Sequence, residues 1–240
     1  MKEFEILFGI KGSQVKENCI LMPIITKNIL KELKLKKLSK GKLYNSGNSR
    51  NFTLIHTRVG AGFTGDAVLH LKDTPCKNII LFGSCGLIPY QGNLSIGSLF
   101  CPSKCYSSEG FSNTLLKTDK LGSHVFYPDK SLLRSLLNTG QKTGINKAIC
   151  LTIPSLKLEE EKLSLLIKKG IQIVDMECSA VFAAAKYAGI KTAALFYASD
   201  IIKTNPFYLS LTPAQETTLS SAIKKSVSCI CKLIKKNLGA

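Results

Sequence analysis

Residues 171–200 read IQIVDMECSAVFAAAKYAGIKTAALFYASD, and this stretch decides how the chain is interpreted. Two apolar runs, Ile171–Val174 and Thr192–Ala198, flank a segment of small residues at Ser179–Tyr187. The pattern predicts a strand, a helix and a second strand. Ligands of open α/β sheets bind in the crevice at the carboxyl ends of the strands. The stretch therefore predicts a site where these two strands end.

Two carboxylates and a thioether stand at the predicted strand ends. Asp175, Met176 and Glu177 follow the first strand, and Ser199 and Asp200 close the second. An alternative gives these side chains structural roles, because Met176 can pack in the core and Glu177 can be a first-turn acid favoured by the helix dipole. In the same alternative Asp200 caps a helix at a strand end. The rest of the sequence has to decide between the two interpretations.

Strands and helices are predicted to alternate along the remaining chain. We expect strands at Glu5–Gly9, Phe52–Val59, Asn78–Phe82, Leu94–Cys101 and Ala148–Ile153. We expect helices from about Val15, at Thr64–Leu71, Lys130–Leu137 and Glu159–Lys169, and from Pro213 onward. No linker or internal repeat interrupts this order. The sequence therefore predicts an α/β fold: a single three-layer α/β/α domain over residues 1–240 around a central mixed or parallel sheet.

The composition sets limits on the class of protein. A chain of 240 residues that is 45% hydrophobic can bury one sizeable core, and it has no apolar run near the roughly 18–20 residues that span a bilayer. Residues 1–5 read MKEFE, which is unlike a signal peptide. The nine cysteines are odd in number and scattered, which favours buried free thiols in a cytoplasmic protein. Because neither Cys101 and Cys105 nor Cys229 and Cys231 have the paired spacing of a zinc site, we expect no metal.

The formal net charge of +17 raises the question of a nucleic-acid partner. The lysines cluster at Lys27–Lys42 and Lys224–Lys236, and both segments have the Leu and Ile spacing of amphipathic helices. Neither segment has interleaved aromatic residues, and no nucleic-acid-binding motif is present. We therefore interpret the lysines as solvated helix faces, whose positive field can attract an anionic substrate such as phosphate.

Glycines are predicted to form turns after several strands. Three such turns lie at Gly9–Gly12, Gly60–Gly62 and Gly83–Gly86, and a weaker one lies at Gly97. Glycine lets backbone N–H groups approach an anion closely, and a following helix adds its positive end. Ser84 adds a hydroxyl donor. Together with the carboxylates at other strand ends, the turns indicate a polar, partly anionic ligand.

Five segments in order give the chain a resemblance to a known family. They are Ile79–Leu87, Ile96–Leu99, Ser107–Gly110, Phe126–Pro128, and Val174–Glu177 with Ser199-Asp200. Together they resemble the nucleoside phosphorylase superfamily, which includes purine nucleoside and uridine phosphorylases, methylthioadenosine/S-adenosylhomocysteine nucleosidases and futalosine hydrolases. The resemblance covers about residues 4–203 and implies an enzyme that cleaves the N-glycosidic bond of a nucleoside.

The resemblance implies roles for the residues of the opening stretch. Glu177 matches the glutamate that binds the ribose hydroxyls, and Met176 matches the methionine that packs on the sugar. Asp200 matches the general acid that protonates or hydrogen-bonds the imidazole-ring nitrogen of a purine, which requires a raised pKa. We expect Asp175 to cap or orient its neighbours locally and not to touch substrate. Gly83 and Ser84 are also expected at the substrate.

The sequence departs from the family in the residues that distinguish phosphorolysis from hydrolysis. Leu81 stands where phosphorylases carry an arginine. If Gly12 is the first glycine of the family pattern, Lys16 takes the place of a second arginine, and Gly12, Lys16 and Ser84 form a phosphate pocket. If Gly9 is that glycine, Gln14 replaces the glutamate that activates water in hydrolases, and an amide cannot act as a base. We predict phosphorolysis of a purine nucleoside to free base and sugar 1-phosphate, with hydrolysis as the alternative.

The residues that would recognise the base are also unusual. Family members often stack the base on an aromatic residue about 22 positions before the methionine, and residues 153–156 here read IPSL. Phe207 or Tyr208 is a substitute. Phe126 falls where nucleosidases of the family contribute a ring to a neighbouring protomer's site, or else it packs in the core. Arg58 is either an anion ligand or a surface cation.

The resemblance also bears on partners and on competing functions. It implies no cofactor beyond phosphate as a co-substrate, and assembly of the chain with itself as a dimer, trimer or hexamer. We expect a small nucleoside as ligand, no membrane and no nucleic acid. A protein that binds nucleosides without cleaving them is the alternative from another class. The pair of Glu177 and Asp200 favours an enzyme, because binding alone needs no acid at the base.

Overall fold

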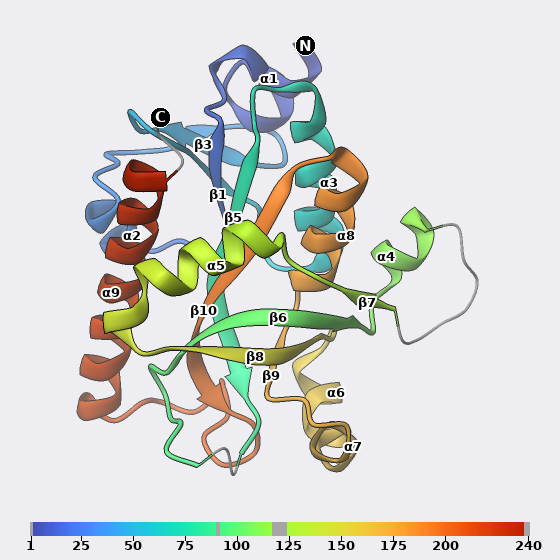
Figure 1. Cartoon of the computed structure of the whole chain (residues 1–240), viewed down its shortest axis with the longest axis vertical. Helices are drawn as coiled ribbons and strands as arrows, with labels where there is room; N and C mark the ends of the chain where they lie inside the picture. The colour runs from blue at the N-terminus through green and yellow to red at the C-terminus, as the bar shows by residue number, and fades with distance from the viewer. Residues whose placement is uncertain (1, 90–91, 117–123, 238–240) are drawn as a thin grey trace.

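The computed structural model describes residues 2–89, 92–116 and 124–237, and in them a mixed sheet lies between two layers of helices (Figure 1). The sheet order is β10-β6-β8-β9-β5-β1-β4-β3-β2, with β7 paired to β6. The strands of this part of the chain are β1 (Asn18–Met22), β2 (Ser39–Lys40), β3 (Asn45–Asn48), β4 (Thr53–His56), β5 (Asn78–Leu87), β6 (Leu99–Ser107), β7 (Val125–Phe126), β8 (Ile145–Thr152), β9 (Ile173–Asp175) and β10 (Lys191–Ile201). Parallel and antiparallel pairs both occur, which confirms the expected mixed sheet.

The helices cover the two faces of the sheet. One face is covered by α1 (Lys2–Phe8), α3 (Ala61–His70), α4 (Gly110–Leu115) and α8 (Cys178–Ala188). The other is covered by α2 (Lys27–Glu32), α5 (Lys130–Thr139) and α9 (Pro213–Asn237). Two short helices, α6 (Leu156–Glu161) and α7 (Leu163–Lys168), pack near β9. The α/β class predicted from the sequence is confirmed.

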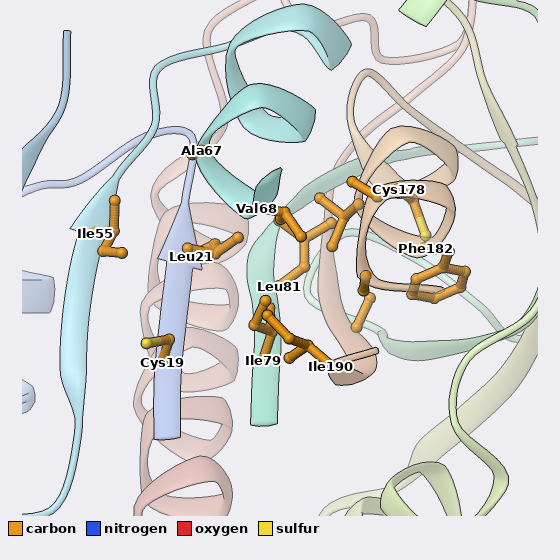
Figure 2. Close-up of a cluster of buried hydrophobic side chains, with 14 of the residues drawn as sticks. Cys19, Leu21, Ile55, Ala67, Val68, Ile79, Leu81, Cys178, Phe182 and Ile190 are labelled. Atoms are coloured by element: carbon orange, nitrogen blue, oxygen red, sulfur yellow. The ribbon is translucent and has the colours of Figure 1, made fainter. Parts of the chain in front are cut away.

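Successive side chains of the central strands point to opposite faces of the sheet, as the geometry of a strand requires. Leu21 of β1 and Leu81 of β5 pack toward α3 and α8, and Figure 2 shows them in this core with Val68 and Phe182. The next residue along each strand, Met22 or Phe82, packs toward α2 and α9. Both faces of the sheet are therefore buried, which explains the almost continuous apolar runs of β1 and β5.

The long strand β5 changes its partner along one edge. β10 pairs with one edge from Asn78 to Leu87. On the other edge β1 pairs with residues 78–81, and β9 pairs with Gly86 and Leu87. β1 is parallel to β5 and β9 is antiparallel to it, so the ends of both strands face the gap between them. The backbone of residues 82–85 has no strand partner in that gap, and the gap positions the site.

The N-terminal part of the prediction is wrong. The expected strand Glu5–Gly9 belongs largely to helix α1, in which Phe4 and Phe8, four residues apart, stack with ring centroids 4.1 Å apart. The expected helix from Val15 is instead a short 3₁₀ turn, Gly12–Gln14, followed by strand β1. In a short segment, alternate apolar residues fit a strand, but residues four apart also fall on one helix face. The first strand of the sheet therefore begins at Asn18.

Several boundaries also differ from the predicted ones. The expected turn Gly83–Gly86 lies inside β5, which continues to Leu87. The strand expected at Leu94–Cys101 begins at Leu99, and the single helix expected at Glu159–Lys169 is divided into α6 and α7. The strand–helix–strand unit of the opening stretch is present as β9, α8 and β10.

The two lysine-rich segments behave differently. Lys224–Lys236 lies in α9, whose lysines are exposed while Val227, Ile230 and Leu233 are buried against the sheet. The segment Lys27–Lys42 is helical only from Lys27 to Glu32. None of the described helices is both long and apolar enough to cross a bilayer.

Candidate active site

A cavity opens at the gap in the β5 edge and encloses about 720 Å³, including its open mouth. Its lining comes from the ends of β1 and β9, from β5, β10 and α6, and from the loop after β10. The lining residues are Pro23, Ile24, Val59, Gly83, Ser84, Cys85, Gly86, Leu156, Glu159, Val174, Asp175, Met176, Glu177, Ser199, Asp200 and Phe207.

Glu177 connects the end of β9 to the turn before α3. It follows β9 at the start of α8 and is 5% exposed. Its Oε1 accepts a hydrogen bond of 2.7 Å from the backbone N–H of Gly60. Burial raises the pKa of Glu177 to about 7, against the backbone hydrogen bonds from Gly60 and Met176, which lower it. The side chain is therefore anchored on one oxygen and lies in the cavity wall.

Asp175 has the local role that the sequence predicted. Its Oδ2 accepts hydrogen bonds from the backbone N–H groups of Glu177, at 2.9 Å, and Cys178. Its Oδ1 accepts a 2.6 Å hydrogen bond from the Thr152 hydroxyl. Asp175 thus caps the start of α8 and ties it to β8, which holds Met176 and Glu177 at the cavity.

Asp200 lies on β10 opposite Gly86 of β5, where the register of the two strands shifts by one residue. The shift falls at Ser199, whose hydroxyl donates a 2.6 Å hydrogen bond to Asp200 Oδ1. A bulge of this kind redirects the side chains that follow it. Asp200 is 6% exposed, and burial raises its pKa while the Ser199 hydrogen bond lowers it. A carboxyl group with a raised pKa in a cavity is suited to donate a proton.

Glu159 is a fourth acidic side chain in the cavity, and the sequence analysis missed it. It belongs to α6, which Ser155 caps by accepting a hydrogen bond from the backbone N–H of Leu158. Glu159 is only 4% exposed, although it opens the acidic run Glu159–Glu161. Successive helical residues are about 100° apart, so neighbours in such a run can lie on different faces of the helix, and Glu159 lies on the buried one. Burial, then the negative charges of Asp200 and Glu160, raises the pKa of Glu159 to about 8.

The remaining predicted substrate residues lie in the cavity wall. Gly83 and Ser84 line it from β5, and Met176 lines it after β9. Phe207 lies at the mouth and is 54% exposed. Tyr208 contributes to a smaller neighbouring hollow instead. Of the two proposed aromatic substitutes, the structure brings Phe207 to the cavity.

The predicted phosphate pocket is not assembled. Gly12 is buried near Phe4 and Thr74, and Lys16 precedes β1, where its backbone N–H donates to Thr53 Oγ1. Lys16 is therefore at the start of β1, whereas the cavity is at its end, and neither residue lines the cavity. The assignment counted from glycines that do not follow a strand. Only Ser84 of the three predicted phosphate residues lines the cavity.

Phe126 and Arg58 are also outside the residues that line the cavity. Phe126, in β7, is buried in the core beneath α8, as the core-packing alternative predicts. Arg58 is exposed just after β4 and has a φ of 66°, a conformation that non-glycine residues seldom adopt. Its neighbour Val59 lines the cavity, so the turn itself reaches the site.

Three cysteines that the sequence spacing did not connect meet behind Asp175. Cys105 of β6, Cys150 of β8 and Cys178 of α8 are buried, and their sulfur atoms lie within 4.8 Å of one another. Among the described residues, this is the group of side chains whose atoms are close enough to ligate one ion. The cluster lies in the core and not in the cavity wall.

The charge of the cavity limits its chemistry. The described residues that line it include four carboxyl groups and no lysine, arginine or histidine. Burial and mutual repulsion raise the pKa of carboxyl groups that have no nearby cation, so such groups keep their protons to a higher pH than usual. The arrangement can therefore bind hydroxyl groups and donate protons.

The fold and site define an α/β protein with an acidic small-molecule cavity at the strand ends. The chain matches the sequence profile of the Phosphorylase superfamily over residues 25–235 and belongs to that superfamily, which consists of enzymes. This finding confirms the resemblance seen in the sequence.

Solved structures of this fold include proteins of different activities. The chain is similar to uridine phosphorylase from Vibrio fischeri, with a TM-score of 0.74 and 19% identity, over 97% of this chain and 100% of that one. It is similar to purine nucleoside phosphorylase from Toxoplasma gondii, with a TM-score of 0.72 and 19% identity, over 95% of each chain. It is similar to 5′-methylthioadenosine/S-adenosyl homocysteine nucleosidase from Campylobacter jejuni, with a TM-score of 0.71 and 15% identity, over 92% and 99%. No curated protein matches the chain by sequence.

Proposed function

We propose that the chain cleaves the N-glycosidic bond of a purine nucleoside with water as the acceptor. The observation that carries this proposal is that two buried carboxyl groups, Glu177 and Asp200, line one cavity that has no cation among its described lining residues. Cleavage develops positive charge on the sugar and negative charge on the base. Nearby carboxylates stabilise the first charge, and a protonated carboxyl group neutralises the second.

The proposed roles follow from the contacts of each side chain. Gly60 engages Oε1 of Glu177, which leaves Oε2 to accept hydrogen bonds from sugar hydroxyls. Ser199 engages Oδ1 of Asp200, which leaves Oδ2 to donate to a ring nitrogen of the base. Met176 packs on the sugar and Phe207 on the base, at the open side of the cavity. The reaction needs no cofactor.

Water is favoured over phosphate because of charge. Phosphate brings between one and two negative charges at neutral pH, and the cavity offers four carboxyl groups and the Ser84 hydroxyl. Phosphate sites in proteins use arginine, lysine or a helix N-terminus to balance that charge. Lys16, which the sequence analysis assigned to this task, lies at the other end of β1. Phosphorolysis is therefore the second candidate, with Ser84 as its support.

The test is product analysis with and without phosphate. Purified protein is incubated with inosine, adenosine, methylthioadenosine, futalosine and uridine, and the products are separated by chromatography. Free base and free sugar at equal rates in both conditions support the proposal. Sugar 1-phosphate that forms only with phosphate would establish phosphorolysis. If no nucleoside is cleaved but one still binds, the protein is a nucleoside-binding protein.

A further inference from the structure

Glu159 and Asp200 approach the same point above Gly86 from two different elements. Glu159 comes from α6 and Asp200 from β10. A Cβ atom placed on Gly86 would lie 3.2 Å from Asp200 Oδ2 and 3.6 Å from Glu159 Oε2. Glycine at this position leaves the space between the two carboxyl groups open. Both oxygens therefore lie close to the same point of the cavity wall.

No hydrogen bond among the described residues engages either of these two oxygens. The Ser199 hydroxyl donates to Asp200 Oδ1, which leaves Oδ2 as the oxygen near the Gly86 position that Glu159 Oε2 also approaches. Among the described residues the carboxyl group of Glu159 has no hydrogen-bond partner, although the residue is 4% exposed. A largely buried carboxyl group without a partner is costly when it is ionised, which favours its protonated form.

The other titratable groups around the pair do not supply a positive charge. Glu160 lies beside Glu159 on α6, and Tyr208 faces Glu160. Asp175 and Glu177 approach from the end of β9, and the buried thiol of Cys85 lies on β5. All of these groups are neutral or negative. A negative charge on either member of the pair therefore favours a proton on the other.

We infer that Glu159 is a positioning residue that shares a proton with Asp200 and keeps Asp200 able to protonate the leaving base at neutral and mildly alkaline pH. This inference rests on the proposed function. Two carboxyl groups that interact strongly lose their protons in two separate steps that belong to the pair. Between these steps one proton remains and resides on either group. The burial-raised pKa of Glu159, about 8, agrees with a proton held into the alkaline range.

The proton balance of the reaction fits this arrangement. Asp200 gives its proton to a ring nitrogen of the base as the glycosidic bond breaks and its electron pair moves to the base. Both carboxyl groups of the pair are then ionised. The water that adds to the sugar releases one proton, which returns to the pair through solvent. The pair ends each cycle with the number of protons with which it began.

The test is the pH dependence of kcat/KM for wild type, Glu159→Gln and Glu161→Gln on the nucleoside that the wild type cleaves. Glutamine has the size of glutamate but cannot share a proton, and Glu161 is an exposed member of the same helix. We expect the alkaline limb of the profile to move to lower pH by about one unit or more in Glu159→Gln, because Asp200 no longer shares a proton with a second carboxyl group. Glu161→Gln should reproduce the wild-type profile. An alkaline limb at the same pH in Glu159→Gln and wild type would overturn the inference.

A second measurement separates this inference from the proposed function. Carboxyl-labelled protein is titrated by ¹³C NMR, in wild type and in Asp200→Asn. We expect Glu159 to titrate near pH 8 in the wild type and at a lower pH in the variant, because the neighbouring charge is gone. An unchanged titration would overturn the shared proton, whether or not the protein cleaves nucleosides. If the wild type cleaves no nucleoside while the two titrations differ, the proposed function fails and the carboxyl pair stands.

Discussion

The backbone N–H of Gly60 donates a 2.7 Å hydrogen bond to Oε1 of Glu177, across 117 residues of sequence. The bond joins the turn before α3 to the start of α8, two helices that pack on the same face of the sheet. Gly60 has a φ of 119°, which side chains other than glycine rarely allow. The glycine turn that the sequence analysis assigned to an anion therefore binds a carboxylate of the protein itself.

This hydrogen bond allows us to predict the effect of Glu177→Gln on activity. An amide oxygen can still accept from Gly60, so the fold should be retained, but the oxygen that faces the cavity loses its charge. Hydrogen bonds to charged groups contribute about 1.5–3 kcal/mol, so we expect kcat/KM for a ribonucleoside to fall about 10- to 100-fold. The measurement is a comparison of ribosides with the matching deoxyribosides. Equal losses on both would argue against sugar recognition by Glu177.

Asp200→Asn tests the acid. The amide keeps the size of the side chain but cannot give its proton to the base. We expect turnover of purine nucleosides to fall by a factor on the order of 10²–10⁴, as for the loss of a general acid. A nitrophenyl riboside is the control, because its leaving group departs without protonation. If both substrates lose activity equally, the substitution has disturbed the cavity and has not removed an acid.

The opening stretch of sequence predicted its part of the fold well. The runs that became β9 and β10 are apolar and bounded by polar residues, and the small residues of α8 allow it to pack closely on the sheet. The strand predicted at the N-terminus was wrong because Phe4, Ile6 and Phe8 alternate as in a strand, while Phe4 and Phe8 also share one helix face. Tertiary packing decides between these periods, and packing is not visible in a short segment.

The site was predicted where a residue could be placed by the strand that precedes it. Glu177 follows β9 and Asp200 lies near the end of β10, and both reach the cavity. Glu159 was overlooked because it belongs to a run of three glutamates, which is typical of a solvated face. Lys16 was assigned to a pocket because the first strand was placed one element too early. Both errors concern which face or end of an element a side chain occupies.

The position of Lys16 in the structure leads to a further prediction. Lys16 lies at the start of β1 and the cavity lies at its end. We therefore expect Lys16→Ala to leave the rate and its dependence on phosphate unchanged within error. Initial rates measured over a range of phosphate concentrations give the comparison. A phosphate requirement that rises only in the variant would return Lys16 to the site, and the acceptor would then have to be reconsidered.

Gly86 should tolerate a side chain less well than Gly83, although both lie in β5 and line the cavity. A Cβ atom on Gly86 would lie 3.0 Å from Val174 Cγ2 and 3.2 Å from Asp200 Oδ2, whereas one on Gly83 has Pro23 Cδ as its nearest atom, at 3.6 Å. Overpacking in a core costs about 1–3 kcal/mol. We expect Gly86→Ala to lower the melting temperature and Gly83→Ala to leave it nearly unchanged. The opposite order of the two melting temperatures would contradict the close approach of Val174 and Asp200 to Gly86.

The raised pKa of Glu159 makes folding stability depend on pH. The ordinary pKa of the group is 4.5 and its pKa in the folded protein is about 8, so between these values the folded state holds a proton that the unfolded state has lost. Stability that Glu159 contributes below pH 4.5 is therefore lost as pH rises toward 8. Glu159→Gln removes this loss, so its melting temperature relative to wild type should rise between pH 5 and pH 8.5. For a domain of this size each kcal/mol corresponds to about 2–4 °C, which calorimetry resolves. Glu161→Gln, at an exposed position, should differ from wild type in melting temperature by the same amount at both pH values. If the difference for Glu159→Gln is also constant, Glu159 has the same pKa in the folded and unfolded chain.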